Sequence, residues 1–358
     1  MNITHNAKNI VDNCRFCWMC RHICPIGNAT GHERCTARAR SFAISMVERG
    51  ATELCEVADN IYECTLCGAC TNNCVTGFDP KVFVEEVKRE VVLAGLTPDY
   101  IMALLERYAS TGNVYGIEEP RLDDKYYTED GDTLFFAGAD AQLKAPECIK
   151  EALDLLEAAG VKPAYVSSED SGFALRFLTG KTEETLNAVK KCAELLNKYK
   201  KVIVYDPIDL AFMLHEYREW GVEVTSELIS FNDYLLSLID YGKIKVKHGN
   251  NEYTLQDNYA YARELDDCES GRKLIAAVGV SRDMLLIGKE ANLAGQLIMS
   301  EYMPAVMERV ALDRWQNAVN MGCKTVVTEN TAEYLALKVT APEGYRVITI
   351  EEMIKENM

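Results

Sequence analysis

The chain has 358 residues, of which 48% are hydrophobic, and it carries a formal net charge of −17. This apolar content is enough for packed cores, which excludes a disordered chain, and the length suggests about two or three domains. The charge is uneven, because residues 1–50 contain seven Lys and Arg against three acids, which leaves −21 for the remainder. This acidic bulk excludes nucleic acid as a partner, since no extended basic surface is available to displace its counterions.

The sequence shows no signal for export or for membrane insertion. No charge-free run approaches the roughly 18 apolar residues of a membrane span. The chain opens with MNITHNAKNI rather than with a charged and then apolar signal peptide. We therefore expect a cytoplasmic protein that does not insert directly into a membrane.

The most specific feature is a pair of cysteine runs with the same CxxCxxCxxxC spacing. A four-iron cluster needs four thiolates, and in two-cluster ferredoxins the fourth cysteine of each run binds the other cluster. The spacing therefore predicts two [4Fe-4S] clusters. The expected ligands of the first, cluster 1, are Cys14, Cys17, Cys20 and Cys74. The expected ligands of the second, cluster 2, are Cys64, Cys67, Cys70 and Cys24.

Zinc and disulfides are the alternative explanations for these cysteines. Structural zinc sites are typically built from two CxxC pairs, which leaves the third and fourth cysteine of each run unexplained. Disulfides are typical of small secreted domains, unlike this chain. The spacing thus favours iron–sulfur clusters. The basic residues near the runs then have two explanations, which the sequence leaves open: they neutralise anionic clusters, or they dock an acidic protein.

The chain between and after the runs has helical rather than strand periodicity. Helices are expected at residues 36–49, 83–93 and 99–108. A small ferredoxin built on two hairpins would have less chain between its runs, so we expect an α-helical ferredoxin domain at residues 1–110. Residues 111–132 are rich in Gly, Pro, Asp and Glu and predict a linker.

From residue 133 onward, short apolar runs alternate with helical segments. Strands are expected to begin near residues 134, 202, 284 and 325. Strands that alternate with helices indicate α/β layers around a largely parallel sheet. The fold class expected for the whole chain is therefore α+β multidomain.

This half of the sequence also contains an internal repeat. A strand, helix, strand and helix over residues 201–239 recur over residues 324–355, with the second strands expected at 221–225 and 344–349. Two consecutive units in the same order indicate a duplication. We expect a first α/β repeat at residues 133–245 and a second at residues 246–358.

The layout resembles the iron–sulfur subunits of the glycolate oxidase, anaerobic glycerol-3-phosphate dehydrogenase and heterodisulfide reductase D/C type. These subunits pair a helical two-cluster ferredoxin domain with a duplicated cysteine-rich domain. The resemblance is specific over residues 14–100 and only organisational beyond them. It implies an electron-transfer subunit of a larger complex.

The second half departs from that family, because the places that match its cysteine signatures keep no cysteine. These places include Ala139, Asp206, Asp209, Tyr259 and Glu329. Carboxylates do not replace soft thiolates in an iron–sulfur site, so we expect no cluster in this half. The acids are expected to be solvated loop residues, with a hard-cation site as the alternative. The remaining cysteines of this half are expected to be packed in the core: Cys148, Cys192, Cys268 and Cys323.

No motif in the chain indicates a nucleotide or flavin site of its own. We therefore expect no catalytic residue and an electron-transfer role between an FAD-containing flavoprotein oxidoreductase and a downstream acceptor, with further electron-transfer subunits as additional partners. One alternative is a reductase with its own site built from Asp206, Asp209 and Glu329. Another is a scaffold subunit whose α/β half supplies a docking surface.

Overall fold

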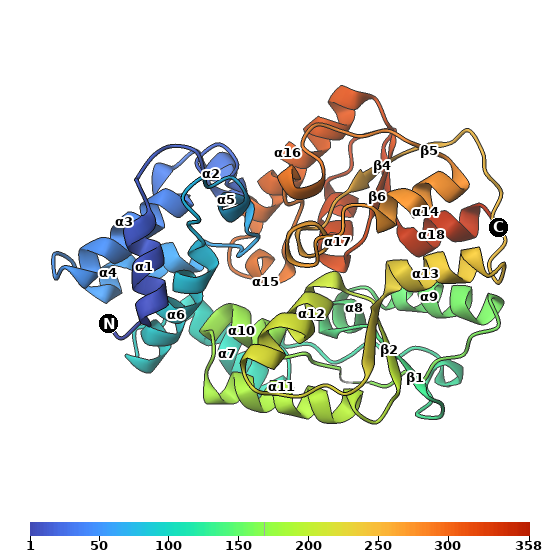
Figure 1. The fold of residues 1–358 in the computed structure, drawn as a ribbon, viewed down its shortest axis with the longest axis horizontal. Coiled ribbons are helices and arrows are strands. Elements are labelled where there is room, and N and C mark those ends of the chain that lie inside the picture. The colour runs from blue at the N-terminus through green and yellow to red at the C-terminus, as the bar shows by residue number, and fades with distance from the viewer. Residues whose placement is uncertain (168) are drawn as a thin grey trace. The chain divides into compact units, whose positions relative to one another are not determined.

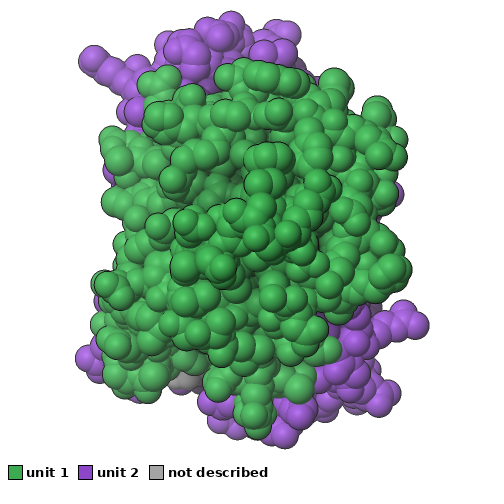
Figure 2. Space-filling model, turned by 90° about the vertical axis from the view of Figure 1, so that its left-hand side faces the viewer, with its two compact units in different colours: residues 1–116, 172–187, 298–310 green, residues 117–171, 188–297, 311–358 purple. Residues whose placement is uncertain are grey.

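The computed structural model describes residues 1–167 and 169–358, and Figure 1 labels its helices and strands. The chain divides into two compact units, which Figure 2 shows in different colours. Unit 1 comprises residues 1–116, 172–187 and 298–310, and unit 2 comprises residues 117–171, 188–297 and 311–358. Two segments that the sequence places within the α/β repeats, 172–187 and 298–310, therefore belong to unit 1.

Unit 1 is built from helices, and the helices expected from the sequence are confirmed as α3, α6 and α7. Thr36 caps the start of α3 by accepting a hydrogen bond from the Ala39 amide at 3.4 Å. Asp79 caps α6, and Pro80 takes the first helical position, where its missing N–H costs nothing. The helices are α1 (His5–Asn13), α2 (Pro25–Thr30), α3 (Ala37–Glu48), α4 (Leu54–Tyr62), α5 (Ala69–Asn72), α6 (Pro80–Leu93), α7 (Asp99–Thr111), α10 (Phe173–Thr179), the start of α11 (Glu183–Leu196), most of α15 (Leu297–Ser300) and the start of α16 (Pro304–Met321).

Helix α6 forms the centre of unit 1. It packs against α1, α4 and α10. Its residues Phe83, Val84, Val87 and Val91 are completely buried and recur at the spacing of one helical face. Burial of such side chains stabilises the fold by about 1.5–3 kcal/mol each. Helix α6 therefore joins α1, which precedes the first cysteine run, to α10, which comes much later in the chain.

Unit 2 contains two small parallel sheets. The first has the order β1-β2-β3, and the second has the order β5-β4-β6-β7. All of their strand pairs are parallel. The strands are β1 (Thr133–Phe136), β2 (Lys201–Val204), β3 (Glu227–Ser230), β4 (Glu252–Gln256), β5 (Val280–Ser281), β6 (Thr325–Thr328) and β7 (Arg346–Thr349).

Helices surround both sheets, and one apolar core runs through unit 2. This core includes Phe135 and Ile203 from the first sheet and Leu255 and Val327 from the second. Buried strands of this kind are typical of parallel sheets that helices cover. The helices are α8 (Ala139–Lys144), α9 (Pro146–Ala158), most of α11, α12 (Pro207–Phe212), α13 (Phe231–Asp240), α14 (Ser270–Val278), the rest of α16, α17 (Thr331–Thr340) and α18 (Ile350–Glu356).

The same order of elements occurs twice in unit 2, as β2-α12-β3-α13 and as β6-α17-β7-α18. Each of these four helices follows its strand directly and begins at a residue whose side chain accepts from a backbone amide. Such caps satisfy donors that the first helical turn leaves unpaired. The capping residues are Asp206, Ser230, Asn330 and Thr349.

Two strand expectations are wrong. Residues 284–287 form no strand, because Leu286 has a positive φ of 61° that breaks an extended path, and Leu285 is 66% exposed. The strand expected at 221–225 lies further on, as β3. The chain before it is held as a loop, where Thr225 donates from its amide to Asn197 Oδ1 at 2.7 Å.

Among the described residues, no helix has the length and apolar character needed to cross a bilayer.

Candidate iron–sulfur centre

The four cysteines expected to bind cluster 2 line one pocket in unit 1. These residues are Cys24, Cys64, Cys67 and Cys70. Cys24 comes from the first run and caps α2, where its thiol accepts from the Gly27 amide at 3.5 Å. Cys64 and Cys67 follow α4 on a tight loop, and Cys70 lies in the short helix α5 that comes next. This loop reverses through Leu66 and Gly68, which have positive φ values of 58° and 70°.

The thiols of this pocket influence one another electrostatically. Burial raises the pKa of Cys24, and the nearby thiols of Cys67 and Cys64 raise it further. Burial also raises the pKa of Cys70, to which Cys64, Cys67 and Cys24 contribute in turn. Four thiolates gathered in a buried site repel one another strongly, because the low dielectric screens them poorly. Positive charge bound among the sulfur atoms would offset this repulsion.

The first run forms an open loop after α1. Cys14 is half-buried and Cys17 is exposed, whereas Cys20 is buried. The pKa of Cys20 is raised to about 11, chiefly by burial and in part by Cys14 and Cys24. Phe16 adopts a positive φ of 50° between the first two cysteines, a conformation that non-glycine residues rarely adopt. This strain is consistent with a loop shaped around a ligand.

Cys74, the last cysteine of the second run, lies beside the start of the first run. Its Sγ is 3.2 Å from Thr76 Oγ1, and this oxygen lies 3.3 Å from the carbonyl oxygen of Asn13. Burial alone raises the pKa of Cys74. Hydrogen bonds from Thr76 and Phe78 outweigh this effect and hold the pKa below its ordinary value. The hydrogen bonds therefore favour a thiolate at the place expected for the fourth ligand of cluster 1.

The donor set fits an iron–sulfur cluster better than zinc. Among residues 1–167 and 169–358, no three His, Cys, Asp or Glu side chains lie close enough together to hold one metal ion. A structural zinc ion requires four ligands around a single centre. In a four-iron cluster each thiolate binds a different iron, so the sulfur ligands lie further apart. All eight donors are cysteines, the ligands typical of such clusters.

Two buried basic residues lie near the cluster 2 pocket, and no sequence motif marks either of them. Arg40 on α3 lines this pocket and is 1% exposed. Lys88 on α6 is completely buried and donates from Nζ to the Phe177 carbonyl at 2.7 Å. Burial lowers the pKa of Lys88 to about 7, against the attraction of Cys64. The only sequence feature that could have indicated Arg40 and Lys88 is a basic residue within an apolar helical pattern.

The acids at the vacated positions of unit 2 are not solvated loop residues, so that expectation is wrong. Asp206 and Asp209 are buried, and burial raises the pKa of Asp206 to about 7. Asp206 accepts from the Asn330 side chain at 2.7 Å, and Asp209 accepts from the Ser171 hydroxyl at 2.5 Å. Glu329 accepts from the Asn232 side chain at 2.8 Å. These acids therefore belong to internal hydrogen-bond networks.

The other vacated positions and the unit 2 cysteines also lie within the fold. Tyr259 is buried, and Ala139 is partly buried at the start of α8. Three of the four cysteines are buried, as expected, whereas Cys268 is half-buried. Burial raises the pKa of Cys148 and of Cys192. Such thiols behave as small apolar core residues.

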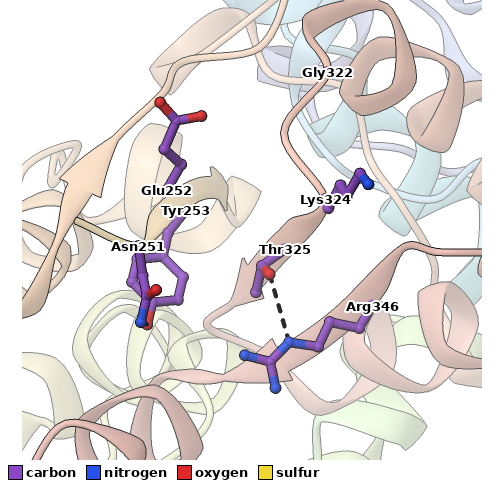
Figure 3. A pocket seen from close by; sticks show the side chains of 7 residues that line it. All are labelled: Asn251, Glu252, Tyr253, Gly322, Lys324, Thr325 and Arg346. Atoms are coloured by element: carbon purple, nitrogen blue, oxygen red, sulfur yellow. Dashed lines mark hydrogen bonds between the residues drawn. The ribbon is translucent and has the colours of Figure 1, made fainter. Parts of the chain in front are cut away.

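A separate polar pocket lies in unit 2 at the amino ends of β4, β6 and β7 (Figure 3). Arg346 Nε donates to Thr325 Oγ1 at 3.5 Å, and its guanidinium also pairs with Glu356. Ligands of parallel α/β sheets bind at the carboxyl ends of the strands, which is the opposite edge. The lining residues are Asn251, Glu252, Tyr253, Gly322, Lys324, Thr325 and Arg346.

Comparison with known proteins supports the iron–sulfur assignment of unit 1. Residues 10–78, which include all eight cysteines of the two runs, match the family of 4Fe-4S dicluster domains. A search of curated proteins found no match. The fold is similar to that of a hypothetical protein from Helicobacter pylori, with a TM-score of 0.61 and 12% identity, covering 99% of this chain and 73% of that one. Residues 10–78 thus form a ferredoxin-like iron–sulfur domain.

Proposed function

We propose that this chain is an electron-transfer subunit that holds two [4Fe-4S] clusters. The observation that carries the proposal is the pocket in which Cys24 of the first run meets Cys64, Cys67 and Cys70 of the second. Crossed ligation of this kind is the arrangement of two-cluster ferredoxins. The dicluster match over residues 10–78 supports the same reading.

The ligand sets follow from this crossing. Cluster 2 takes Cys64, Cys67, Cys70 and Cys24. Cluster 1 takes Cys14, Cys17, Cys20 and Cys74, supported by the link from Cys74 through Thr76 to Asn13. When bound, such clusters supply one-electron transfer.

The protein around the two sites differs in a way that suits a relay. Cys17 in the first set is exposed, whereas Cys24 and Cys67 in the second set are only 8% and 7% exposed. Each set contains buried and half-buried thiols, but only the first includes an exposed one, Cys17, which allows close approach of a redox partner. Solvent exposure and hydrogen bonds to sulfur are among the factors that set cluster potentials.

We further propose that the electrons pass between an FAD-containing flavoprotein oxidoreductase and a downstream acceptor, within a complex that includes other electron-transfer subunits. The support is the sequence resemblance to iron–sulfur subunits of that type and the lack of a nucleotide or flavin motif in this chain. The alternative of a reductase site at Asp206, Asp209 and Glu329 is disfavoured, because protein groups already hydrogen-bond all three acids.

The test is anaerobic analysis of iron and sulfide with electron paramagnetic resonance of the reduced protein. Two clusters correspond to about eight iron and about eight sulfide per chain. Stoichiometric zinc with negligible iron would refute the proposal. For the wider role, the proteins that copurify under anoxic conditions should include one that carries flavin. Substrate turnover by the purified single chain at enzyme-like rates would contradict a purely electron-transferring subunit.

A further inference from the structure

The loop of the first cysteine run presents large apolar side chains to solvent. Trp18 is 60% exposed and Met19 is 46% exposed, and both lie between Cys17 and Cys20. Phe42 on α3 is 54% exposed, and its ring packs edge-on against Phe16 of the loop, with the ring centres 5.6 Å apart. Exposed tryptophan is unusual on a soluble surface, and aromatic residues are enriched at the centres of protein interfaces.

Trp18 is held in place despite its exposure. The guanidinium groups of Arg21 and Arg38 each lie 5.2 Å from the centre of its ring, which is cation–π contact. Both arginines pair with Glu33, at 2.8 Å and 2.6 Å respectively. Arg38 also donates from Nε to the Phe16 carbonyl at 2.7 Å. The ring is therefore fixed before any partner arrives, which reduces the entropy lost on binding.

The arginines near the cysteines fall into a buried set and an exposed set, which lie at different sites. Arg40 is buried in the cluster 2 pocket, where its charge offsets the thiolates. Arg15 and Arg21 are exposed, and Arg21 contacts Trp18 at the surface. The buried arginine therefore lies where it can offset the charge of cluster 2, whereas Arg15 and Arg21 lie at the surface.

We propose that the surface formed by Arg15, Trp18, Met19, Arg21 and Phe42 is the docking site of an acidic redox protein. This surface, named the Trp18 surface, combines apolar and basic side chains and includes part of the loop that carries Cys17. Its charge is opposite to the bulk of the chain, since residues 1–50 carry +4 and the remainder carries −21. A partner with carboxylates around an exposed cofactor would match it in charge.

This inference rests on the proposed electron-transfer function and adds the site and chemistry of the partner. The apolar side chains would exclude water where the two redox centres approach each other. The basic side chains would steer the encounter and speed association, an effect that salt weakens. Electrons would enter or leave through cluster 1, because the Trp18 surface contains no part of the cluster 2 pocket.

The salt dependence of electron transfer distinguishes local docking from overall charge. The dithionite-reduced holoprotein would be mixed in a stopped-flow instrument with oxidised flavodoxin, an acidic carrier, and separately with basic cytochrome c. A net charge of −17 alone predicts that the rate with the acidic carrier rises with salt. Docking at the Trp18 surface predicts the opposite, a rate that falls as salt is added.

Variants locate the effect on the surface. Arg21→Glu and Phe42→Glu should each lower the low-salt rate constant with flavodoxin by about tenfold or more. The control Arg49→Glu changes an exposed arginine outside the Trp18 surface and should retain most of the natural rate. Trp18→Ala should also slow the reaction. Phe42→Glu lies outside both cysteine runs, so it keeps the test valid if Trp18→Ala assembles poorly.

Several outcomes would overturn the inference. These are a rate with flavodoxin that rises with salt, equal rates for the natural protein and Arg21→Glu, or an equal loss in Arg49→Glu. A concentration-dependent dimer in sedimentation that Arg21→Glu abolishes would show that a second copy of the chain occupies the surface instead. Iron content and paramagnetic spectra of every variant are measured first. A natural protein without clusters would refute the proposed function itself, which is a different result.

Discussion

The buried guanidinium of Arg40 lies beside the thiol of Cys24, and both line the cluster 2 pocket. Arg40 also donates to the carbonyls of Asn60 at 2.9 Å and Glu63 at 2.7 Å, and these bonds join α3 to the end of α4 just before Cys64. Burial opposes the charge of Arg40, but Cys64, Cys24 and Glu63 together raise its pKa above the ordinary value. A fixed positive charge is therefore placed against a proposed anionic cluster.

We predict that Arg40→Gln lowers the reduction potential of cluster 2. The reduced cluster carries more negative charge than the oxidised one, so loss of a nearby cation destabilises the reduced form. The expected shift is on the order of tens of millivolts. Glutamine still offers two N–H donors to the two carbonyls. Redox titration followed by paramagnetic resonance measures the shift.

The exposed Arg49→Gln serves as the matched control and should leave both potentials unchanged. Arg40→Lys keeps the charge and should shift the potential less than Arg40→Gln does. An unchanged cluster 2 potential in Arg40→Gln would show that this charge does not tune the site.

Crossed ligation predicts which cysteine variants resemble one another. Cys24→Ser and Cys67→Ser should alter the same paramagnetic signal, although these residues belong to different runs, because both line one pocket. Cys17→Ser should alter the other signal. Anaerobic purification and spectroscopy of the three variants provide the measurement. If Cys24→Ser instead reproduced the spectrum of Cys17→Ser, each run would hold its own cluster.

The cysteines of unit 2 should not bind iron. Cys148, Cys192 and Cys323 are each less than 5% exposed and lie within the core. Replacing each by Ala should leave the iron content of the chain unchanged while lowering the melting temperature, since loss of a buried sulfur leaves a small cavity. Iron analysis and thermal denaturation of the single variants check this. Loss of iron from any of them would place a cluster in unit 2.

Glu351 should make unit 2 less stable as the pH rises. It is 1% exposed and accepts from the Tyr205 hydroxyl at 2.7 Å, and burial raises its pKa to about 7. Between about pH 4.5 and 7 the folded state keeps a proton that the unfolded state has lost. The free energy of unfolding therefore falls by about 1.4 kcal/mol per pH unit, or about 3 kcal/mol in total.

Glu351→Gln removes this titration, and its amide oxygen still accepts from Tyr205. The melting temperature of the variant relative to the natural protein should therefore rise between pH 5 and pH 8. The exposed Glu343→Gln is the control and should show no such trend. A constant difference between Glu351→Gln and the natural protein across this range would contradict the prediction.

Much of the secondary structure followed from local sequence. The helices α3, α6 and α7 begin at or beside residues that cap or start a helix, and the strand-to-helix turns of unit 2 repeat the same device at Asp206 and Asn330. The failures at residues 221–225 and 284–287 have a different origin. Apolar composition alone does not reveal a backbone reversal such as that at Leu286, nor a loop held by a distant side chain such as Asn197.

The sequence by itself determined the identity and spacing of the eight cysteines, because the chemistry of a cluster dictates how many thiolates are needed and how closely three of them must follow one another. Tertiary structure decided which charges surround them. Lys88 obtains its carbonyl acceptor from Phe177, which lies 89 residues further along the chain. Asp206 and Asn330 meet although 124 residues separate them. Burial, and with it the cost of an ionised group, depends on such distant contacts, and no local pattern records them.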